Sequence, residues 1–425
     1  MSSAKRNEGD GGTTARRGYG LAALAFSVAT GLGLLEVALR VVPQAIPPSL
    51  LLLFEPGLRA DIAAGSYPLQ KDFREVPRDD GGPPLFVAKP ESPIVSIDET
   101  KNGAERVTDE VGFCNPAGRY HGRERIELIA LGDSFSWCHA VVPQRAWPAL
   151  LEEKTGLLTF SLGRGGTGPY EYVQFLREFG LPKRPRVVIL NIYGGNDLRD
   201  AAAWRDHRDA LRSGRKPPSK TPDQVAPGLV ASALGRHSYA LNLVLAAVSL
   251  AVHDDPRDAE KEGIDFGYQV LLPSGPVEFN VENRDRDEVV SARHLQDGST
   301  PLEIWDEALA RFGALARERG FTAVVSYTPS AWAAYAGRVG LADPTLGEAL
   351  DNFDAAQRRH LAERAAADGY LFHDLSADLQ EAAAHADASG LLYDPVHVHL
   401  SERGNEVVAE SLARFLAGKG VKKSL

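Results

Sequence analysis

Four short segments carry the residue types that acyl transfer requires. Together they offer a serine hydroxyl, glycine N–H groups, an asparagine amide and a histidine with a carboxylate nearby. A neutral histidine can take the serine proton, a carboxylate can fix the histidine tautomer, and N–H donors can stabilise the oxyanion of a tetrahedral intermediate. The set predicts nucleophilic catalysis by the serine. In chain order the segments are Gly132-Asp133-Ser134, Gly163-Arg164-Gly165-Gly166, Gly195-Asn196-Asp197 and Asp394-Pro395-Val396-His397-Val398-His399.

The first segment means little when it is taken alone, because Asp133 and Ser134 are also ordinary helix-capping residues. Its position adds weight, since an apolar run of strand length, residues 126–131, ends just before it. We expect Ser134 between the end of a buried strand and the start of a helix. There its hydroxyl would face the ligand-binding edge of a sheet, and helix N–H groups would stabilise negative charge.

The elements that must position these segments follow an α/β rhythm. Strand-like runs alternate with helical patterns, which implies right-handed crossovers and a parallel sheet with helices on both faces. We therefore expect a three-layer α/β/α sandwich of the flavodoxin-like kind. The strands are expected at 126–131, 157–162, 187–192, 322–327 and 370–374, and the helices at 146–153, 171–179, 303–319, 350–368 and 403–417. Between residues 198 and 300 the rhythm breaks down, which indicates an insertion.

The chain begins with a predicted membrane anchor. Residues 18–35 carry no charge, and a spanning helix needs ~20 mainly apolar residues. Arg16 and Arg17 precede this run and favour a cytoplasmic N-terminus, although a cleaved secretory signal is the alternative. The expected organisation is a cytoplasmic tail (1–17), an anchor (18–42), a stalk or lead-in (43–123) and an extracytoplasmic α/β domain (124–420) with the insertion at about 198–300.

The two cysteines fit an exported domain, where disulfides persist. Cys138 follows Ser134 by four residues, and Cys114 precedes the first predicted strand. We predict a disulfide between them, with two unrelated buried thiols as the alternative.

The overall charge excludes one class of partner. The formal net charge is −10, whereas a nucleic-acid groove needs clustered Lys and Arg to release counterions from phosphates. We therefore expect no nucleic-acid partner. With 44% hydrophobic and 24% charged residues, the composition is that of a globular protein.

The ordered set of segments resembles the SGNH (GDSL-type) hydrolases over about residues 126–417, apart from the insertion. The resemblance implies the SGNH fold, Ser134 as nucleophile and no cofactor. It also implies an oxyanion hole formed by the N–H of Ser134, the N–H of Gly166 and the side chain of Asn196. Gly166 is preferred to Gly163 because the oxyanion glycine of the family is the second glycine of a G-x-x-G turn.

The last segment departs from the family pattern. The family histidine stands five residues before a glycine, here Gly404, which selects His399 as the base. The acid two or three residues earlier is missing, so we predict that Asp394 orients His399. The alternative base is His397, which satisfies a D-x-x-H spacing with Asp394.

The spacing of two histidines also bears on metal binding. His397 and His399 would share one face of an extended segment and could ligate Zn²⁺, but a third ligand is not evident in the sequence. We therefore expect no metal. His139, five residues after the nucleophile, could line the site, although a surface or capping role is the more ordinary interpretation.

An N-terminal anchor before such a domain resembles bacterial enzymes that acetylate or deacetylate cell-envelope polysaccharides. The leading hypothesis is therefore hydrolysis or transfer of an O-acyl group, expected to be acetyl, on an extracytoplasmic carbohydrate. Lipid ester hydrolysis is the second enzymatic hypothesis, motivated by the apolar stretch at 241–252. A catalytically silent glycan-binding protein with the SGNH fold is the third.

Overall fold

The computed structural model divides by its contacts into two units, residues 1–69 with 219–255, and residues 70–218 with 256–425. Each unit is described by itself. The described residues are 11–46, 50, 54, 58, 74–83, 85–88, 90, 91, 107–215, 237–252, 260, 261, 263–281, 285–341 and 343–421.

A sheet of five parallel strands forms the centre of the second unit, in the order β10-β8-β5-β3-β4. The first strand along the chain, β3, lies between the second and the third, which is the doubly wound order of flavodoxin-like folds. The predicted parallel sheet is confirmed. The strands are β3 (Leu128–Leu131), β4 (Thr159–Ser161), β5 (Val187–Tyr193), β8 (Thr322–Thr328) and β10 (Leu371–Asp374).

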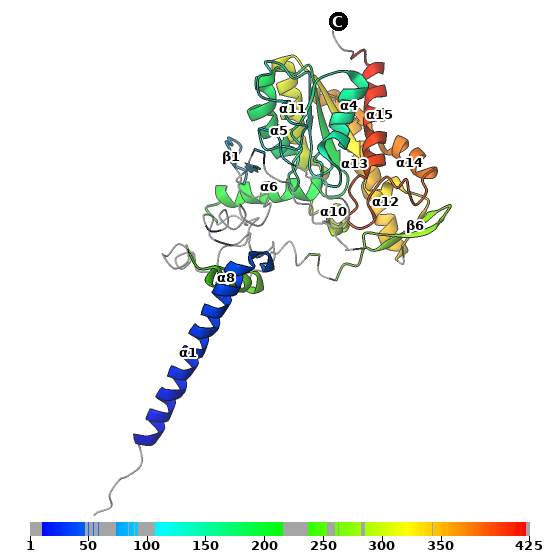
Figure 1. Ribbon diagram of the computed structural model, residues 1–425. Coiled ribbons are helices and arrows are strands. Elements are labelled where there is room, and N and C mark those ends of the chain that lie inside the picture. The colour runs from blue at the N-terminus through cyan, green and yellow to red at the C-terminus, as the bar shows by residue number, and fades with distance from the viewer. Residues whose placement is uncertain are drawn as a thin grey trace, which may run out of the picture. The chain divides into compact units, whose positions relative to one another are not determined.

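Helices cover both faces of this sheet and complete the predicted three layers (Figure 1). The helices α5 and α11 lie on one side of the strands, and α4 and α15 pack together on the other. The helices of this unit are α4 (Trp147–Thr155), α5 (Pro169–Phe175), α6 (Asp197–Arg212), α10 (Arg286–Asp297), α11 (Asp306–Arg319), α12 (Ala331–Ala334), α13 (Pro344–Asp368), α14 (Ser376–Ala384) and α15 (Glu402–Gly418).

The central strands explain why the sequence showed continuous apolar runs. Every residue of β3 and of β5 is buried, because helices cover the two faces. Local signals fix the helix ends. Asp343 accepts the N–H of Thr345 and Leu346 at the start of α13, and Gly369 ends that helix in the left-handed region.

The region expected to break the α/β rhythm is partly helical. Residues 197–212 and 286–297 form α6 and α10, and a hairpin of β6 (Tyr268–Leu272) and β7 (Gly275–Phe279) lies between them in sequence. Half of the residues of α6 are charged, which hid its helical pattern, although Leu198, Ala201 and Trp204 are buried on one side.

Part of the expected stalk belongs to the core of the second unit. The short strands β1 (Arg74–Val76) and β2 (Leu85–Val87) pair with each other, and Phe113 is fully buried against the sheet helices. Within the described residues, 74–83, 85–88 and 107–123 of the expected stalk therefore belong to this unit.

The first unit contains α1 (Gly11–Val41), which covers the predicted anchor, and α8 (Tyr239–Val252). Glu36 links them, because its Oε2 accepts hydrogen bonds from Ser238 Oγ at 2.9 Å and from the N–H of Ala240 at 2.8 Å. No helix of the described residues is both long enough and apolar enough to cross a membrane. The side chains of residues 11–22, in the first part of the predicted span, lie outside the described part.

Candidate active site

Ser134 lies on a tight turn directly after β3. Phe135 N–H donates to Asp133 Oδ1 at 2.8 Å, and the N–H groups of Ser136 and Trp137 donate to the carbonyl oxygen of Asp133. Gly132 has φ +158°, and a methyl group added there would lie 2.2 Å from Ser136 Oγ. The expected helix start at Ser134 was wrong, because this turn does not continue and the next α-helix, α4, begins at Trp147.

The structure brings His399 to the serine. Nε2 of His399 is 2.9 Å from Ser134 Oγ, and Nδ1 is 2.9 Å from the carbonyl oxygen of His397. A carbonyl oxygen can only accept, so Nδ1 carries the proton and Nε2 keeps the lone pair that faces the serine hydroxyl. This is the arrangement that a general base requires.

Aromatic rings hold the imidazole of His399 on both faces. Phe135 stacks on it with ring centroids 4.9 Å apart, and His139 stacks on it at 3.8 Å. Behind Phe135 lies Tyr193, at 3.5 Å and nearly parallel. Sequence reasoning missed Phe135 and Tyr193, and no local motif marks them. His139 was noted only as a residue that could line the site.

Asp394 lies beside His397, which corrects its predicted role as the acid that orients His399. Asp394 Oδ1 is 3.6 Å from His397 Nε2 and accepts the N–H of Val396 at 2.8 Å. The physical reason is the backbone of Val398, which has φ +54° and turns the segment out of an extended conformation. The carbonyl oxygen of His397 takes the position expected for the carboxylate.

The glycine turn after β4 packs against the nucleophile. A methyl group added at Gly165 would lie 3.5 Å from Ser134 Cβ, and one added at Gly163 would lie 2.5 Å from the carbonyl oxygen of Ser136. Gly166, the predicted oxyanion donor, has φ +71°, a conformation that side chains disfavour. Gly163 therefore allows close packing, and the turn of Gly165 and Gly166 borders the serine.

Asn196 follows β5, the strand next to β3, and precedes α6. One N–H of its side-chain amide donates to Asp200 Oδ2 at 2.9 Å, and this bond orients the amide. The amide has a second N–H that can donate to a substrate. The turns after β3, β4 and β5 thus meet at one edge, where the strand order reverses and ligands bind in open α/β sheets. Gly166 and Asn196 remain predictions as oxyanion donors.

Buried carboxyl groups support the turns behind the serine. Burial, together with the nearby charge of Asp200, raises the pKa of Asp133 to about 7. Burial also raises the pKa of Asp197, which accepts hydrogen bonds from Tyr172 Oη at 2.7 Å and from Tyr193 N–H at 3.0 Å. These groups organise the backbone and are partly neutral, so they place little fixed negative charge next to the nucleophile.

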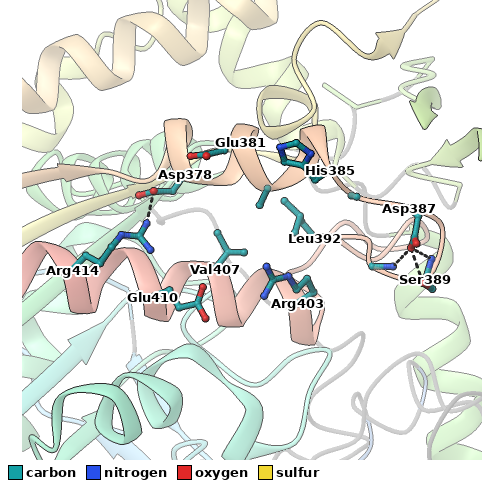
Figure 2. A pocket seen from close by; sticks show the side chains of 13 residues that line it. Asp378, Glu381, His385, Asp387, Ser389, Leu392, Arg403, Val407, Glu410 and Arg414 are labelled. Carbon is teal, nitrogen blue, oxygen red and sulfur yellow. Dashed lines mark hydrogen bonds and ion pairs between the residues drawn. The ribbon is translucent and has the colours of Figure 1, made fainter. Parts of the chain in front are cut away.

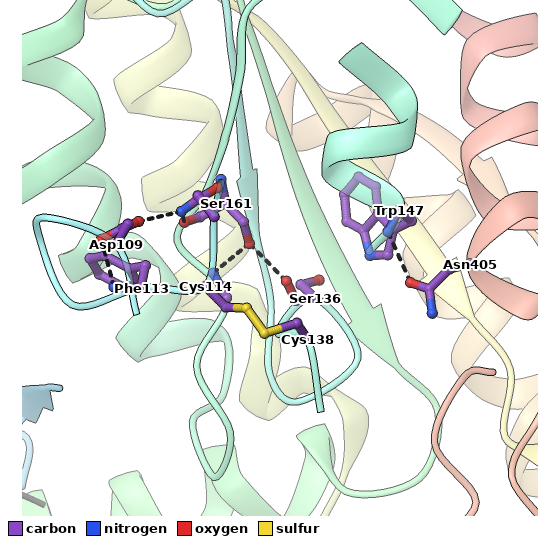
Figure 3. Close-up of a disulfide and its surroundings, with 10 residues drawn as sticks. Asp109, Phe113, Cys114, Ser136, Cys138, Trp147, Ser161 and Asn405 are labelled. Carbon is purple, nitrogen blue, oxygen red and sulfur yellow. Dashed lines mark hydrogen bonds between the residues drawn. A yellow bond between two sulfur atoms is a disulfide. The ribbon is translucent and has the colours of Figure 1, made fainter. Parts of the chain in front are cut away.

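A disulfide ties the turn of Ser134 to the segment before β3 (Figure 3). Cys114 and Cys138 are bonded with Cα atoms 5.9 Å apart, which confirms the predicted pairing. Beside it, the Asn115 side chain bonds both the N–H (2.7 Å) and the carbonyl oxygen (2.9 Å) of Ser161, whose hydroxyl donates to the carbonyl oxygen of Ser136 at 2.7 Å. This support was not visible in the sequence.

A cavity of about 820 Å³ lies between α14 and α15, away from these turns (Figure 2). Its lining includes the ion pair of Asp378 with Arg414 and the side chains of Glu381 and Arg403, and it includes neither Ser134 nor His399. The half-buried site at the sheet edge, rather than this wide polar hollow, carries the reactive groups.

The fold and the site define an α/β protein with a serine–histidine pair at the carboxyl edge of its sheet. No family model matches the chain, and no curated protein sequence matches it. Similar solved structures include a protein of the G-D-S-L family from Desulfitobacterium hafniense (12% identity, TM-score 0.33, 68% of this chain and 99% of that one). A second is the acetyl xylan esterase AlAXEase (13% identity, TM-score 0.33, 68% of this chain and 100% of that one). A third is a catalytic mutant of the acetylxylan esterase Axe2 from Geobacillus stearothermophilus (14% identity, TM-score 0.32, 70% of this chain and 97% of that one). With TM-scores below 0.5, these matches carry no inference about activity.

Proposed function

We propose that this chain is a serine ester hydrolase or acyltransferase of the SGNH type, with Ser134 as nucleophile and His399 as general base. The observation that carries the proposal is the 2.9 Å distance between Ser134 Oγ and His399 Nε2. A hydrogen bond between nucleophile and base, with the base oriented by a third group, is the signature of an activated serine.

The proposed reaction has two halves. In the first, Ser134 Oγ attacks the ester carbonyl carbon while Nε2 of His399 takes the hydroxyl proton, and the leaving alcohol then receives that proton. In the second, water or an acceptor hydroxyl attacks the acyl-serine, with Nε2 again taking the proton and returning it to Ser134. The proposed oxyanion donors are the N–H of Ser134, the N–H of Gly166 and the amide of Asn196.

A carbonyl oxygen replaces the usual carboxylate as the group that orients the base. The bond from Nδ1 of His399 to the carbonyl of His397 selects the tautomer in which Nε2 accepts a proton. A carbonyl carries no full negative charge, so it stabilises the imidazolium less than an aspartate would. The face of Phe135 offsets part of this difference through a cation–π interaction of about 0.5–2 kcal/mol.

We further propose that the substrate is an O-acetylated carbohydrate outside the cytoplasm and that α1 anchors the chain in the membrane. The anchor is supported by the uncharged run at 18–35 and by the arginines before it. The disulfide is consistent with an oxidising compartment. The apolar helix α8, which motivated lipid ester hydrolysis, belongs to the first unit.

Labelling with a fluorophosphonate probe tests the mechanism directly. We expect wild-type protein to be labelled and to turn over p-nitrophenyl acetate, and Ser134→Ala to lose both with a nearly unchanged melting temperature, because a half-exposed turn serine contributes little packing. The matched control is Ser136→Ala, which removes a buried hydroxyl two residues away and should still be labelled. An unlabelled wild-type protein would favour the silent binding protein.

A further inference from the structure

The site contains a third histidine, His139, which the sequence did not indicate as a metal ligand. One ring nitrogen each from His139, His397 and His399 lies within 4.8 Å of the other two. We propose that these three histidines form a binding site for Zn²⁺ or a similar divalent transition metal ion, and that the bound ion inhibits the enzyme by occupying the base. The inhibitory effect rests on the proposed function, whereas the metal site itself does not.

The nitrogen atoms are near the spacing that a zinc ion needs. Zinc–imidazole bonds are about 2.0–2.1 Å, so two nitrogens on one tetrahedral ion are about 3.4 Å apart. Separations of up to 4.8 Å must therefore shorten by up to about 1.4 Å, a movement that two rings share. The rings of His139 and His399 stack with centroids 3.8 Å apart, so one of them must also turn before both in-plane lone pairs point at the ion, and the centroids of His139 and His397 are 5.4 Å apart.

The partners of these rings are those that metal-ligating histidines usually have. A ligating imidazole donates its other N–H to a carbonyl oxygen or stands beside a carboxylate, which fixes its orientation. Nδ1 of His399 bonds the carbonyl oxygen of His397, and Asp394 Oδ1 lies 3.6 Å from Nε2 of His397. The ion would then bind Nδ1 of His397 and displace the long 3.4 Å hydrogen bond that this nitrogen accepts from the N–H of His399. The carboxylate also supplies a negative charge near the ion. In this proposal Asp394 supports the metal site through His397, and it does not orient the base His399.

The site has an open side, since His139 and His399 are half-buried while His397 is 5% exposed. An ion bound by three histidines and exposed on one side keeps a water ligand in the fourth position. Because the Nδ1 proton of His399 is committed to a carbonyl, Nε2 is the nitrogen available to the metal. The ion would therefore displace the hydrogen bond from Ser134 Oγ and remove the acceptor of its proton.

Direct binding can be measured without any enzyme activity. The probe is Co²⁺ added to the Ser134→Ala protein, free of affinity-tag histidines, with the visible absorption of Co²⁺ as the readout. We expect saturable 1:1 binding that His139→Ala in the same background weakens by at least tenfold, and that His385→Ala leaves unchanged, because His385 lies in the separate cavity between α14 and α15. Equal binding with and without His139 would overturn the site. If His139→Ala lowers the melting temperature, His139→Gln repeats the comparison.

Inhibition is tested on the wild-type chain with p-nitrophenyl acetate. Zn²⁺ should inhibit, and Mg²⁺ or Ca²⁺ at the same concentration should not, because imidazole ligands select borderline transition metals over hard cations. His139→Ala should raise the half-inhibitory Zn²⁺ concentration at least tenfold, each variant being compared with its own metal-free rate. Inhibition that does not depend on His139 would contradict the proposal. A wild-type chain that does not turn over ester would refute the proposed function, and the Co²⁺ titration would still decide the metal site.

Discussion

The turn that carries Ser134 and the loop that carries His399 are held in different ways. The turn of Ser134 is fixed from other parts of the chain, through the disulfide to Cys114 and the hydrogen bond from Ser161 to Ser136. The loop of His399 is held largely by bonds between its own residues, although Phe135 and His139 stack on the imidazole and Val281 N–H donates to the carbonyl oxygen of Pro395 at 3.3 Å. Val398 N–H donates to the carbonyl oxygen of Asp394 at 2.9 Å, and Asp394 N–H donates to the carbonyl oxygen of His399 at 2.8 Å.

The nucleophile and the base are therefore kept in position in two different ways. The position of the nucleophile depends on the fold around it, so distant substitutions should move it. The position of the base depends on a few local bonds and on a left-handed valine, which costs about 1–3 kcal/mol and persists only where its surroundings hold it. Variants that weaken one region at a time can test whether the two are independent.

The largest effect is expected in the base loop. His399→Ala should lower turnover of p-nitrophenyl acetate by roughly 10³ or more, because His399 Nε2 lies 2.9 Å from Ser134 Oγ, whereas Asp133 Oδ2, the other acceptor near this hydroxyl in the described part of the chain, lies at 3.4 Å. His397→Ala should cost far less, since its carbonyl, which orients His399, belongs to the backbone and survives the substitution. The measurement is kcat/KM for each variant. A larger loss in His397→Ala would show that the D-x-x-H spacing selects the base.

The second largest effect is expected from loss of the disulfide, which should loosen the turn that carries Ser134. The bond spans 24 residues, so replacing both cysteines by serine should lower the free energy of unfolding by about 3 kcal/mol in the chain-entropy model. Urea unfolding measures this change. We also expect slower labelling of Ser134 at temperatures where the protein stays folded. If neither the free energy of unfolding nor the labelling rate changed, the hydrogen bonds of Ser161 and Asn115 would be enough to hold the turn of Ser134 without the disulfide.

The pH dependence of stability should arise partly on the nucleophile side, with a further contribution from Asp285, whose pKa burial also raises to about 7. Burial raises the pKa of Asp133 to about 7 and that of Asp109 to about 6, from an ordinary value of 3.8. Between about pH 4 and 7 the folded state therefore keeps protons that the unfolded chain has released, so the free energy of unfolding falls as the pH rises.

Thermal melts at pH 5 and pH 8 test this sign, and the melting temperature should be higher at pH 5. Asp133→Asn should reduce the difference, because the amide keeps an oxygen for the N–H of Phe135 without a titrating charge. A protein that is more stable at pH 8 would contradict the expectation.

The smallest effect is expected for Asp394→Asn. An asparagine oxygen can still accept the N–H of Val396, so the loop should keep its shape and turnover should fall by less than about tenfold. If Asp394 were the acid that orients His399, the same change would set the wrong tautomer and cost up to about 10⁴. Steady-state kinetics of this single variant decides between the two roles.

The sequence was sufficient for features that leave a continuous local pattern. The buried strands were predicted because helices on both faces make them mostly apolar, as in β5, where only Asn191 interrupts the apolar run. The choice of His399 came from its distance to Gly404, where an added methyl group would lie 2.1 Å from the carbonyl oxygen of Leu392, so that close packing requires glycine.

Other features depend on three-dimensional placement. The role of Asp394 was mistaken because the identity of Val398 gives no sign of its left-handed backbone. His139 joins the other histidines only through the turn that follows Ser134. The contacts of Asp109 and Asn115 were hidden in a polar stretch that resembled a linker.

The contact of Asn115 with Ser161 has a further consequence, because β4 is the outermost strand on its side of the sheet. An edge strand presents unpaired N–H and carbonyl groups that can recruit a strand from another molecule. Here the Asn115 amide occupies both backbone groups of Ser161, and the Glu152 carboxylate accepts the N–H of Thr159 at 3.0 Å. Two side chains thereby cover the exposed edge of β4 and oppose self-association of the chain through this strand.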